Sequence, residues 1–210
     1  MWVLIGLNNI VENSNHKREV ITKYNSSSPF YDSRYKEIQE IKYQIILYNR
    51  DLKGRFKLDL GCGTGLFIEY LINAKNVDTT SLAFYVGLDI SLNMLLEFKS
   101  KLKKLNKPNF QNKLSLLLSD IENLPFRENK FNTIFSMTSF QNLGDINKAL
   151  IESLRVSKNN TDFNFSILKK KLNLEMLLEF LKPFTEIEQI TSTNDVEDVI
   201  IQGKFIKVKS

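Results

Sequence analysis

Residues 58–65 read Leu58-Asp59-Leu60-Gly61-Cys62-Gly63-Thr64-Gly65, an apolar run followed by glycine at every second position. Glycine adopts positive φ values and lets a ligand approach the backbone, so this spacing predicts a tight turn. Apolar residues recur at helical spacing over residues 66–72, and the first N–H groups of a helix attract polar ligands. The stretch predicts a strand, turn and helix that hold a nucleotide-type ligand. The alternative is a tight turn that binds nothing.

Two further apolar segments end in an aspartate. Residues 84–88 lead into Asp89, and residues 114–119 lead into Asp120. In doubly wound α/β folds the carboxyl ends of parallel strands meet at one edge of the sheet. There, an acidic residue about 20 positions beyond the glycines binds ribose hydroxyls. We therefore expect the glycine turn and both aspartates to form one cofactor site.

Four segments, in this order, resemble the motifs of the class I S-adenosylmethionine-dependent methyltransferases, in the type 11/25-like group. They are residues 59–65, 86–95, 119–126 and 131–136. The resemblance implies a doubly wound, seven-stranded, mostly parallel sheet of the Rossmann-like methyltransferase type, with an N-terminal helical extension. It also implies S-adenosyl-L-methionine as the methyl donor and S-adenosyl-L-homocysteine as the product.

The resemblance assigns the cofactor to the first three motifs. The glycines and Asp59 would hold the methionine part, Asp89 the ribose, and Asp120 the adenine together with the backbone N–H that follows it. The expected cofactor-binding residues are Asp59, Gly61, Cys62, Gly63, Gly65, Asp89, Ile90, Asp120 and Ile121. A nicotinamide dehydrogenase is the alternative, but its usual turn is Gly-x-Gly-x-x-Gly, and residue 66 is leucine.

The methyl acceptor has no equally specific signature. Residues 136–143, past the fourth strand, contain no Asn/Asp-Pro-Pro-aromatic tetrapeptide, no cysteine and no histidine. Polar groups there and tyrosines of the N-terminal extension are the candidates to orient a substrate, although each can equally serve the loop's own structure. These candidates are Tyr24, Tyr31, Thr138, Phe140, Gln141 and Asn142. No catalytic base is assigned, so a catalytically silent cofactor-binding module that stabilises or regulates a partner remains the alternative.

Composition limits the class of protein. The chain has 210 residues and a net charge of +5, which permits an RNA acceptor without requiring one. A single cysteine excludes an intrachain disulfide, and a single histidine argues against a zinc site. No segment approaches membrane-spanning length, so we expect a cytoplasmic protein with no membrane or metal partner. The acceptor is unknown, and an activating partner subunit is compatible with the family.

The expected organisation is a single cofactor-binding domain with an N-terminal extension. Residues 1–20 are expected to be a flexible tail, residues 21–54 a helical lid, and residues 55–210 the S-adenosylmethionine-binding domain. Within the lid, a loop over residues 24–32 precedes a helix that Ser33 caps. The chain should end in an antiparallel hairpin, with Gly203 at a bulge or bend of the last strand.

Overall fold

A seven-stranded sheet organises the protein, in the order β3-β2-β1-β4-β5-β7-β6. The computed structural model describes residues 15–48, 56–74, 84–105 and 111–207. The strands are β1 (Phe56–Leu60), β2 (Phe84–Asp89), β3 (Leu114–Leu118), β4 (Phe131–Met137), β5 (Ser157–Leu168), β6 (Thr185–Thr191) and β7 (Asp198–Phe205). The first five pair in parallel, whereas β7 is antiparallel to both β5 and β6. The expected doubly wound, mostly parallel sheet is confirmed.

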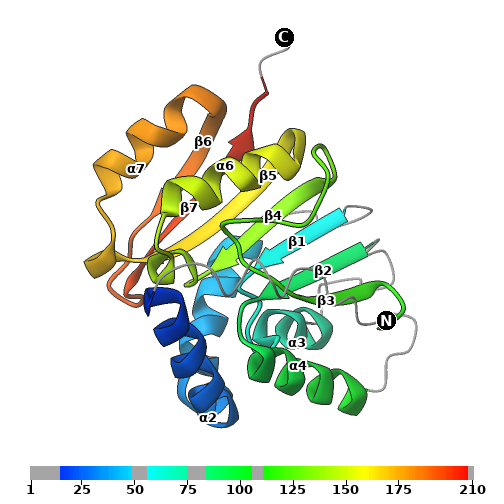
Figure 1. The fold of residues 1–210 in the computed structure, drawn as a ribbon. Helices are drawn as coiled ribbons and strands as arrows, with labels where there is room; N and C mark the ends of the chain where they lie inside the picture. The colour runs from blue at the N-terminus through cyan, green and yellow to red at the C-terminus, as the bar shows by residue number, and fades with distance from the viewer. Residues whose placement is uncertain (1–14, 49–55, 75–83, 106–110, 208–210) are drawn as a thin grey trace.

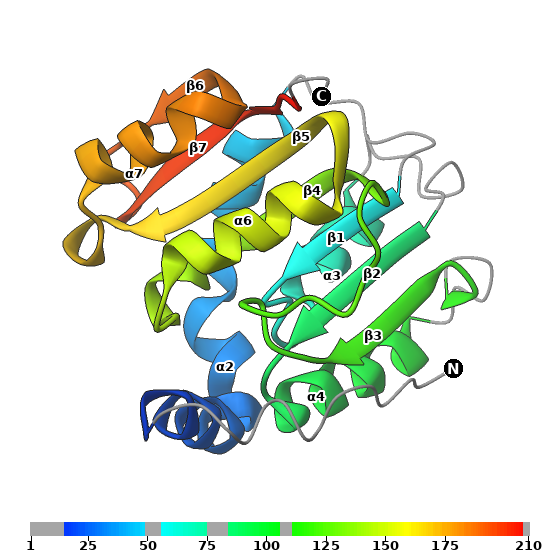
Figure 2. The same ribbon diagram turned by 45° about the horizontal axis from the view of Figure 1, so that its top comes forward.

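Helices cover both faces of the sheet (Figures 1 and 2). They are α2 (Asn15–Leu47), α3 (Leu66–Asn73), α4 (Leu92–Lys104), α6 (Ile146–Val156) and α7 (Leu174–Leu181), with short 3-10 turns η2 (Phe140–Asn142), η3 (Lys169–Lys171) and η4 (Lys182–Phe184). α3 and α4 cover one face and α6 and α7 the other, each over its own cluster of buried side chains. The first part of α2 lies beyond the carboxyl ends of the parallel strands, where folds of this type bind ligands.

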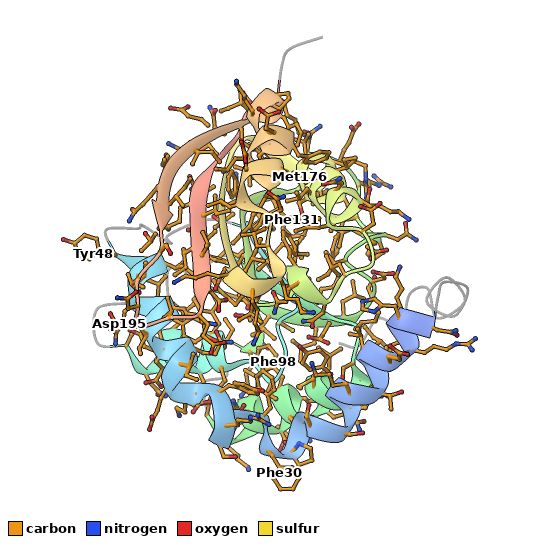
Figure 3. All side chains as sticks on the ribbon, turned by 90° about the vertical axis from the view of Figure 1, so that its left-hand side faces the viewer. Phe30, Tyr48, Phe98, Phe131, Met176 and Asp195 are labelled. Carbon is orange, nitrogen blue, oxygen red and sulfur yellow. The ribbon has the colours of Figure 1, made fainter. Side chains whose placement is uncertain are left out.

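The N-terminal extension is one bent helix instead of a loop followed by a helix. α2 continues through Pro29, and Figure 3 shows two arms that meet near Phe30. Proline has no N–H, so the carbonyl of Asn25 loses its helical partner. That carbonyl instead accepts hydrogen bonds from Ser28 Oγ at 3.2 Å and Asn93 Nδ2 at 3.1 Å. These donors, one of them on α4, allow the helix to continue past the proline.

Two expectations about this extension are therefore wrong. Ser33 lies inside α2 and donates to the carbonyl of Phe30 instead of capping a helix start. Residues 15–20, expected to belong to a flexible tail, are helical. Residues 1–14, the rest of that tail, lie outside the described part of the chain, as does the expected domain boundary at residues 54–55.

The C-terminal hairpin forms as expected, with its irregularity in β6. The β6–β7 register shifts between Ile187 and Gln189, opposite Gly203. A Cβ on Gly203 would overlap the carbonyl oxygen of Glu186. Gly203 therefore makes room for a bulge in the neighbouring strand β6, whereas the sequence suggests a bulge or bend in the last strand itself.

The glycine turn after β1 combines packing with open space. Gly61, Gly63 and Gly65 have φ values of 77°, 54° and 78°. A Cβ on Gly61 would overlap the Ser139 side chain, and one on Gly65 would overlap the ring of Phe98. A Cβ on Gly63 would meet no heavy atom within 4 Å. Gly61 and Gly65 are thus required by packing, whereas Gly63 borders empty space.

This difference predicts unequal stability losses for two alanine substitutions. Gly65→Ala adds overlap with Phe98 to an unfavourable positive φ, and we expect it to lower the free energy of unfolding by about 3 kcal/mol. Gly63→Ala, the matched control, carries only the backbone cost of about 1 kcal/mol. Urea denaturation of both variants measures the difference. Equal losses would show that Phe98 does not constrain the turn.

Candidate functional site

A cavity opens at the carboxyl ends of β1 to β4, beneath α2. Ten of the residues expected from the sequence line it: Tyr24, Tyr31, Gly61, Gly63, Asp89, Ile90, Asp120, Ile121, Thr138 and Asn142. The residues that sequence reasoning missed here are Lys17, Val20, Met94, Glu122, Met137, Ser139 and Leu143. The structure thus brings the three expected cofactor motifs and both lid tyrosines to one cavity.

A smaller hollow adjoins this cavity on the inner side of the glycine turn, and we call it the inner chamber. The two share Tyr31, Gly61, Gly63 and Met137 as lining. Asp59 and Cys62 line the inner chamber only, together with Gln39 of α2. Cys62 is buried, and burial raises the pKa of its thiol well above the usual value. Cys62 therefore stays a neutral packing group at neutral pH.

Three expected residues contribute in other ways. Gly65 precedes α3 and packs against Phe98, away from both hollows. Contrary to expectation, Phe140 does not reach the cavity, because its ring is buried against Phe165 with ring centroids 4.8 Å apart. Gln141 uses its side-chain amide to donate to the backbone carbonyl of Thr138. Phe140 and Gln141 support the loop after β4 and do not line the cavity.

Asp89 joins the end of β2 to the glycine turn. Its Oδ2 accepts the backbone N–H of Gly63 and its Oδ1 that of Ser91, both at 2.8 Å. Burial raises the pKa of Asp89 to about 6, although the hydrogen bonds from Ser91 and Gly63 lower it. The carboxylate therefore fixes the turn and still presents lone pairs beside the cavity.

Asp59 is buried with one oxygen unused. Its Oδ2 accepts a hydrogen bond from the hydroxyl of Tyr85, whereas its Oδ1 has no partner among the described residues. The pKa of Asp59 is raised to about 7, chiefly by burial; the hydrogen bond from Tyr85 lowers this pKa, and the charge of Asp89 raises it. An unpartnered buried acceptor is costly, so this position favours a ligand that donates hydrogen bonds.

Lys17 lies at the end of the cavity that Asp120 and Glu122 line. Its ammonium lies 2.6 Å from Asp120 Oδ2 and 2.6 Å from Glu122 Oε2, and all three residues are buried. Burial lowers the pKa of Lys17, but the hydrogen bonds to the two carboxylates outweigh it and the pKa is raised overall. Residues 15–23 show no apolar helical stripe, so the sequence carried no signal for this contact.

The loop after β4 is held by a buried polar network. Thr138 has a φ of 56°, and its hydroxyl donates to Asp198 Oδ2 at 2.8 Å while accepting from Lys42 Nζ at 2.8 Å. Thr138 is therefore already engaged within the protein. Asn142 donates to the hydroxyl of Tyr24 at 2.9 Å, which ties the first arm of α2 to this loop.

The comparisons with known proteins agree on one family. Residues 58–164 match the family model for the methyltransferase domain. The chain belongs to the class I S-adenosylmethionine-dependent methyltransferases. It is 26% identical, over 198 residues, to the malonyl-[acyl-carrier protein] O-methyltransferase of Hamiltonella defensa, covering 89% of this chain and 70% of that protein.

The solved structures that share the fold include two further methyltransferases. One is the magnesium protoporphyrin IX methyltransferase of Synechocystis with bound S-adenosylmethionine, with a TM-score of 0.70, 16% identity and coverage of 92% and 99% of the two chains. The other is a Haloferax volcanii methyltransferase in complex with the Trm112 activator, with a TM-score of 0.67, 15% identity and coverage of 88% and 98%. As a member of this family, the chain uses S-adenosylmethionine as its methyl donor.

The donor set of the site suits this cofactor. The unpartnered oxygen of Asp59, the open space at Gly63 and the carboxylate of Asp89 offer acceptors and backbone access to an ammonium and a ribose. Within the described ranges, no cluster of three or more His, Cys, Asp or Glu side chains could hold a metal ion. No described helix is long and apolar enough to cross a membrane.

The burial of Asp59 predicts a pH-dependent stability. Its pKa rises from about 3.9 when unfolded to about 7 when folded. The native state thus binds more protons between these values, and stability falls as pH rises through this window. We expect the unliganded protein to melt at a lower temperature at pH 8 than at pH 5. Asp59→Asn should flatten this slope, leaving the smaller contribution of Asp89.

The measurement is a melting curve at each pH from 5 to 8 for both proteins. This range lies above the usual pKa values of Glu69 and Glu152, whose pKa values are lowered by their ion-pair partners. Their stabilising contributions are therefore constant over the range. Identical slopes for the two proteins would mean that Asp59 is ionised throughout.

Proposed function

We propose that the cavity beneath α2 is the site of methyl transfer. Asp59 and the glycine turn would bind the methionine part of S-adenosylmethionine, Asp89 the ribose, and Asp120 with Ile121 the adenine. The observation that carries this proposal is the buried Oδ1 of Asp59, which has no partner in the described residues and faces a chamber joined to the cavity. An ammonium supplies the missing donor and the missing positive charge together.

The residues act by positioning. When bound, S-adenosylmethionine would supply an activated methyl group on a positively charged sulfur, which is a good leaving group for transfer to a nucleophilic acceptor. Asp89 holds the turn at Gly63 and so keeps the binding surface rigid, which favours an in-line approach. Tyr24 and Tyr31 of α2 line the opposite wall, where they exclude water from the reacting groups.

The charges of the site bear on the acceptor. Lys17 is the single cationic residue among the described residues that line the cavity, and Asp120 and Glu122 already neutralise it. The Hamiltonella relative is named for O-methylation of malonyl-[acyl-carrier protein], which bears a carboxylate. A carboxylate would find no free cation on these walls, so we propose an acceptor that reacts through an uncharged atom.

Two groups of lysines, residues 99–107 and 169–171, give limited support to an RNA acceptor. Lys101 lies 2.5 Å from Asp32 and 2.7 Å from Glu69, and Lys169 donates to the carbonyls of Thr193 and Val196. These two lysines serve intramolecular contacts, which supports a small-molecule or protein acceptor over RNA. A cytoplasmic location remains part of the proposal. So does an activating subunit, which the complex of the Haloferax neighbour with Trm112 supports.

Cofactor assignment is tested by ligand-induced stabilisation. S-adenosylhomocysteine should raise the melting temperature of the protein, since a ligand bound only by the folded state stabilises it, whereas NADH should not. Asp89→Ala should weaken S-adenosylhomocysteine binding by about tenfold or more, because it removes a charged acceptor from the ribose site. Asp195→Ala, at an exposed aspartate remote from the cavity lining, is the matched control. Stabilisation by NADH alone, or equal binding by both variants, would contradict the assignment.

A second experiment separates the enzyme from a silent module. Methyl-labelled S-adenosylmethionine is incubated with the protein and with separate metabolite, protein and RNA fractions. We expect label in the metabolite or protein fraction, and loss of that label with Asp89→Ala. Cofactor binding without transfer to any fraction would favour the catalytically silent module that binds the cofactor and regulates a partner.

A further inference from the structure

The inner chamber contains two buried acceptors that lack donors. One is Asp59 Oδ1 and the other is the side-chain oxygen Oε1 of Gln39, on the second arm of α2. Both residues line the inner chamber, with exposed fractions of 1% for Asp59 and 5% for Gln39. Leaving such groups without partners costs about 1–3 kcal/mol each. Two of them in one chamber indicate a ligand group with several N–H donors.

The orientation of the Gln39 amide is set by its neighbours. Thr138 has one hydroxyl proton, which it donates to Asp198, while Lys42 donates to the same hydroxyl. Towards Gln39, the hydroxyl can therefore only accept. Gln39 accordingly presents its NH₂ to Thr138, with Nε2 3.5 Å from Oγ1. Gln39 also hydrogen-bonds the side chain of Tyr31, and this bond lowers the pKa of the Tyr31 hydroxyl, as a donor to that oxygen does. This leaves the carbonyl oxygen of Gln39 for the chamber.

The buried ion pair between Lys42 and Asp198 holds the hydroxyl of Thr138 as an acceptor towards Gln39. Lys42 Nζ lies 2.9 Å from Asp198 Oδ1, and both residues are almost wholly buried. Ser166 and Thr138 both donate to the other oxygen of Asp198, Oδ2, at 2.6 and 2.8 Å. The buried lysine cannot accept a hydrogen bond, and the aspartate needs the threonine proton. Rotating the Gln39 amide would place its oxygen against the lone pairs of Thr138.

We infer that Gln39 is a cofactor-binding residue whose side-chain carbonyl accepts a hydrogen bond from the ammonium of S-adenosylmethionine, opposite Asp59. The inference rests on the proposed placement of the amino-acid end at the glycine turn. An ammonium has three donors, enough for Gln39, Asp59 and a third acceptor. The carboxylate of the same cofactor is acceptor-only, so it would find no donor in Asp59 Oδ1 or Gln39 Oε1. Nothing in the cofactor motifs identifies Gln39, because it comes from the lid helix.

The test compares two ligands on one variant. Gln39→Met keeps the length of the side chain and removes the acceptor. S-adenosylhomocysteine carries the ammonium, whereas 5′-methylthioadenosine has the same nucleoside and no amino-acid end. Calorimetric titration of Gln39→Met should show S-adenosylhomocysteine binding weakened by about tenfold and 5′-methylthioadenosine binding unchanged. Its unliganded melting temperature should change little, since the variant loses both a buried acceptor without a partner and the long hydrogen bond from Nε2 to Thr138.

Gln141→Met is the matched control, because Gln141 also carries a buried Oε1 without a partner but lines neither hollow. It should leave the ratio of the two affinities at the wild-type value. Gln39→Leu serves as a second variant if the methionine variant does not fold. A wild-type ratio in a folded Gln39 variant overturns the inference. Equal weakening of both ligands also overturns it, since that would indicate a structural role. Failure of the wild-type protein to bind either ligand would instead contradict the proposed site.

Discussion

The ion pair between Lys42 and Asp198 connects the N-terminal extension, α2, to the strand β7. Neither residue is more than 2% exposed, and the two charges are 2.9 Å apart. Removing one partner of such a pair leaves a charge buried alone and typically costs about 3–5 kcal/mol. The pair therefore fixes where α2 lies on the sheet. It also fixes the hydroxyl of Thr138, which adopts a positive φ at the end of β4.

Four carboxylates line the cavity and the inner chamber, and the protein neutralises their charges unevenly. Lys17 neutralises Asp120 and Glu122, and two backbone N–H groups stabilise Asp89. Asp59 accepts a hydrogen bond only from the hydroxyl of Tyr85 among the described residues, and burial without a cationic partner raises its pKa. The remaining unsatisfied charge thus lies at the glycine turn. A cationic ligand group is therefore stabilised most strongly beside Asp59. An anionic acceptor would meet no unneutralised cation among the described residues that line the cavity.

Sequence reasoning succeeded where the chemistry is local. The glycine turn, Asp89 and Asp120 each follow directly from a strand, so their spacing along the chain predicts their meeting at one edge of the sheet. It failed for α2, where Pro29 normally indicates a helix end. The helix continues because Asn93 donates to the carbonyl of Asn25, which proline leaves without a partner and which lies 68 positions earlier in the chain. Gln39 and Lys17 were missed for the same reason, since their roles depend on partners distant in sequence.

The bend at Pro29 explains how one helix serves both ends of the site. Lys17 and Gln39 are separated by 22 residues, which would span about 33 Å in a straight helix. A nucleotide-sized ligand is far shorter than that distance. Because the two arms meet near Phe30 (Figure 3), Lys17 reaches the Asp120 end while Gln39 reaches the chamber behind Gly61. The bend at Pro29 therefore allows α2 to contact the site at two places, with Lys17 at Asp120 and Gln39 in the inner chamber.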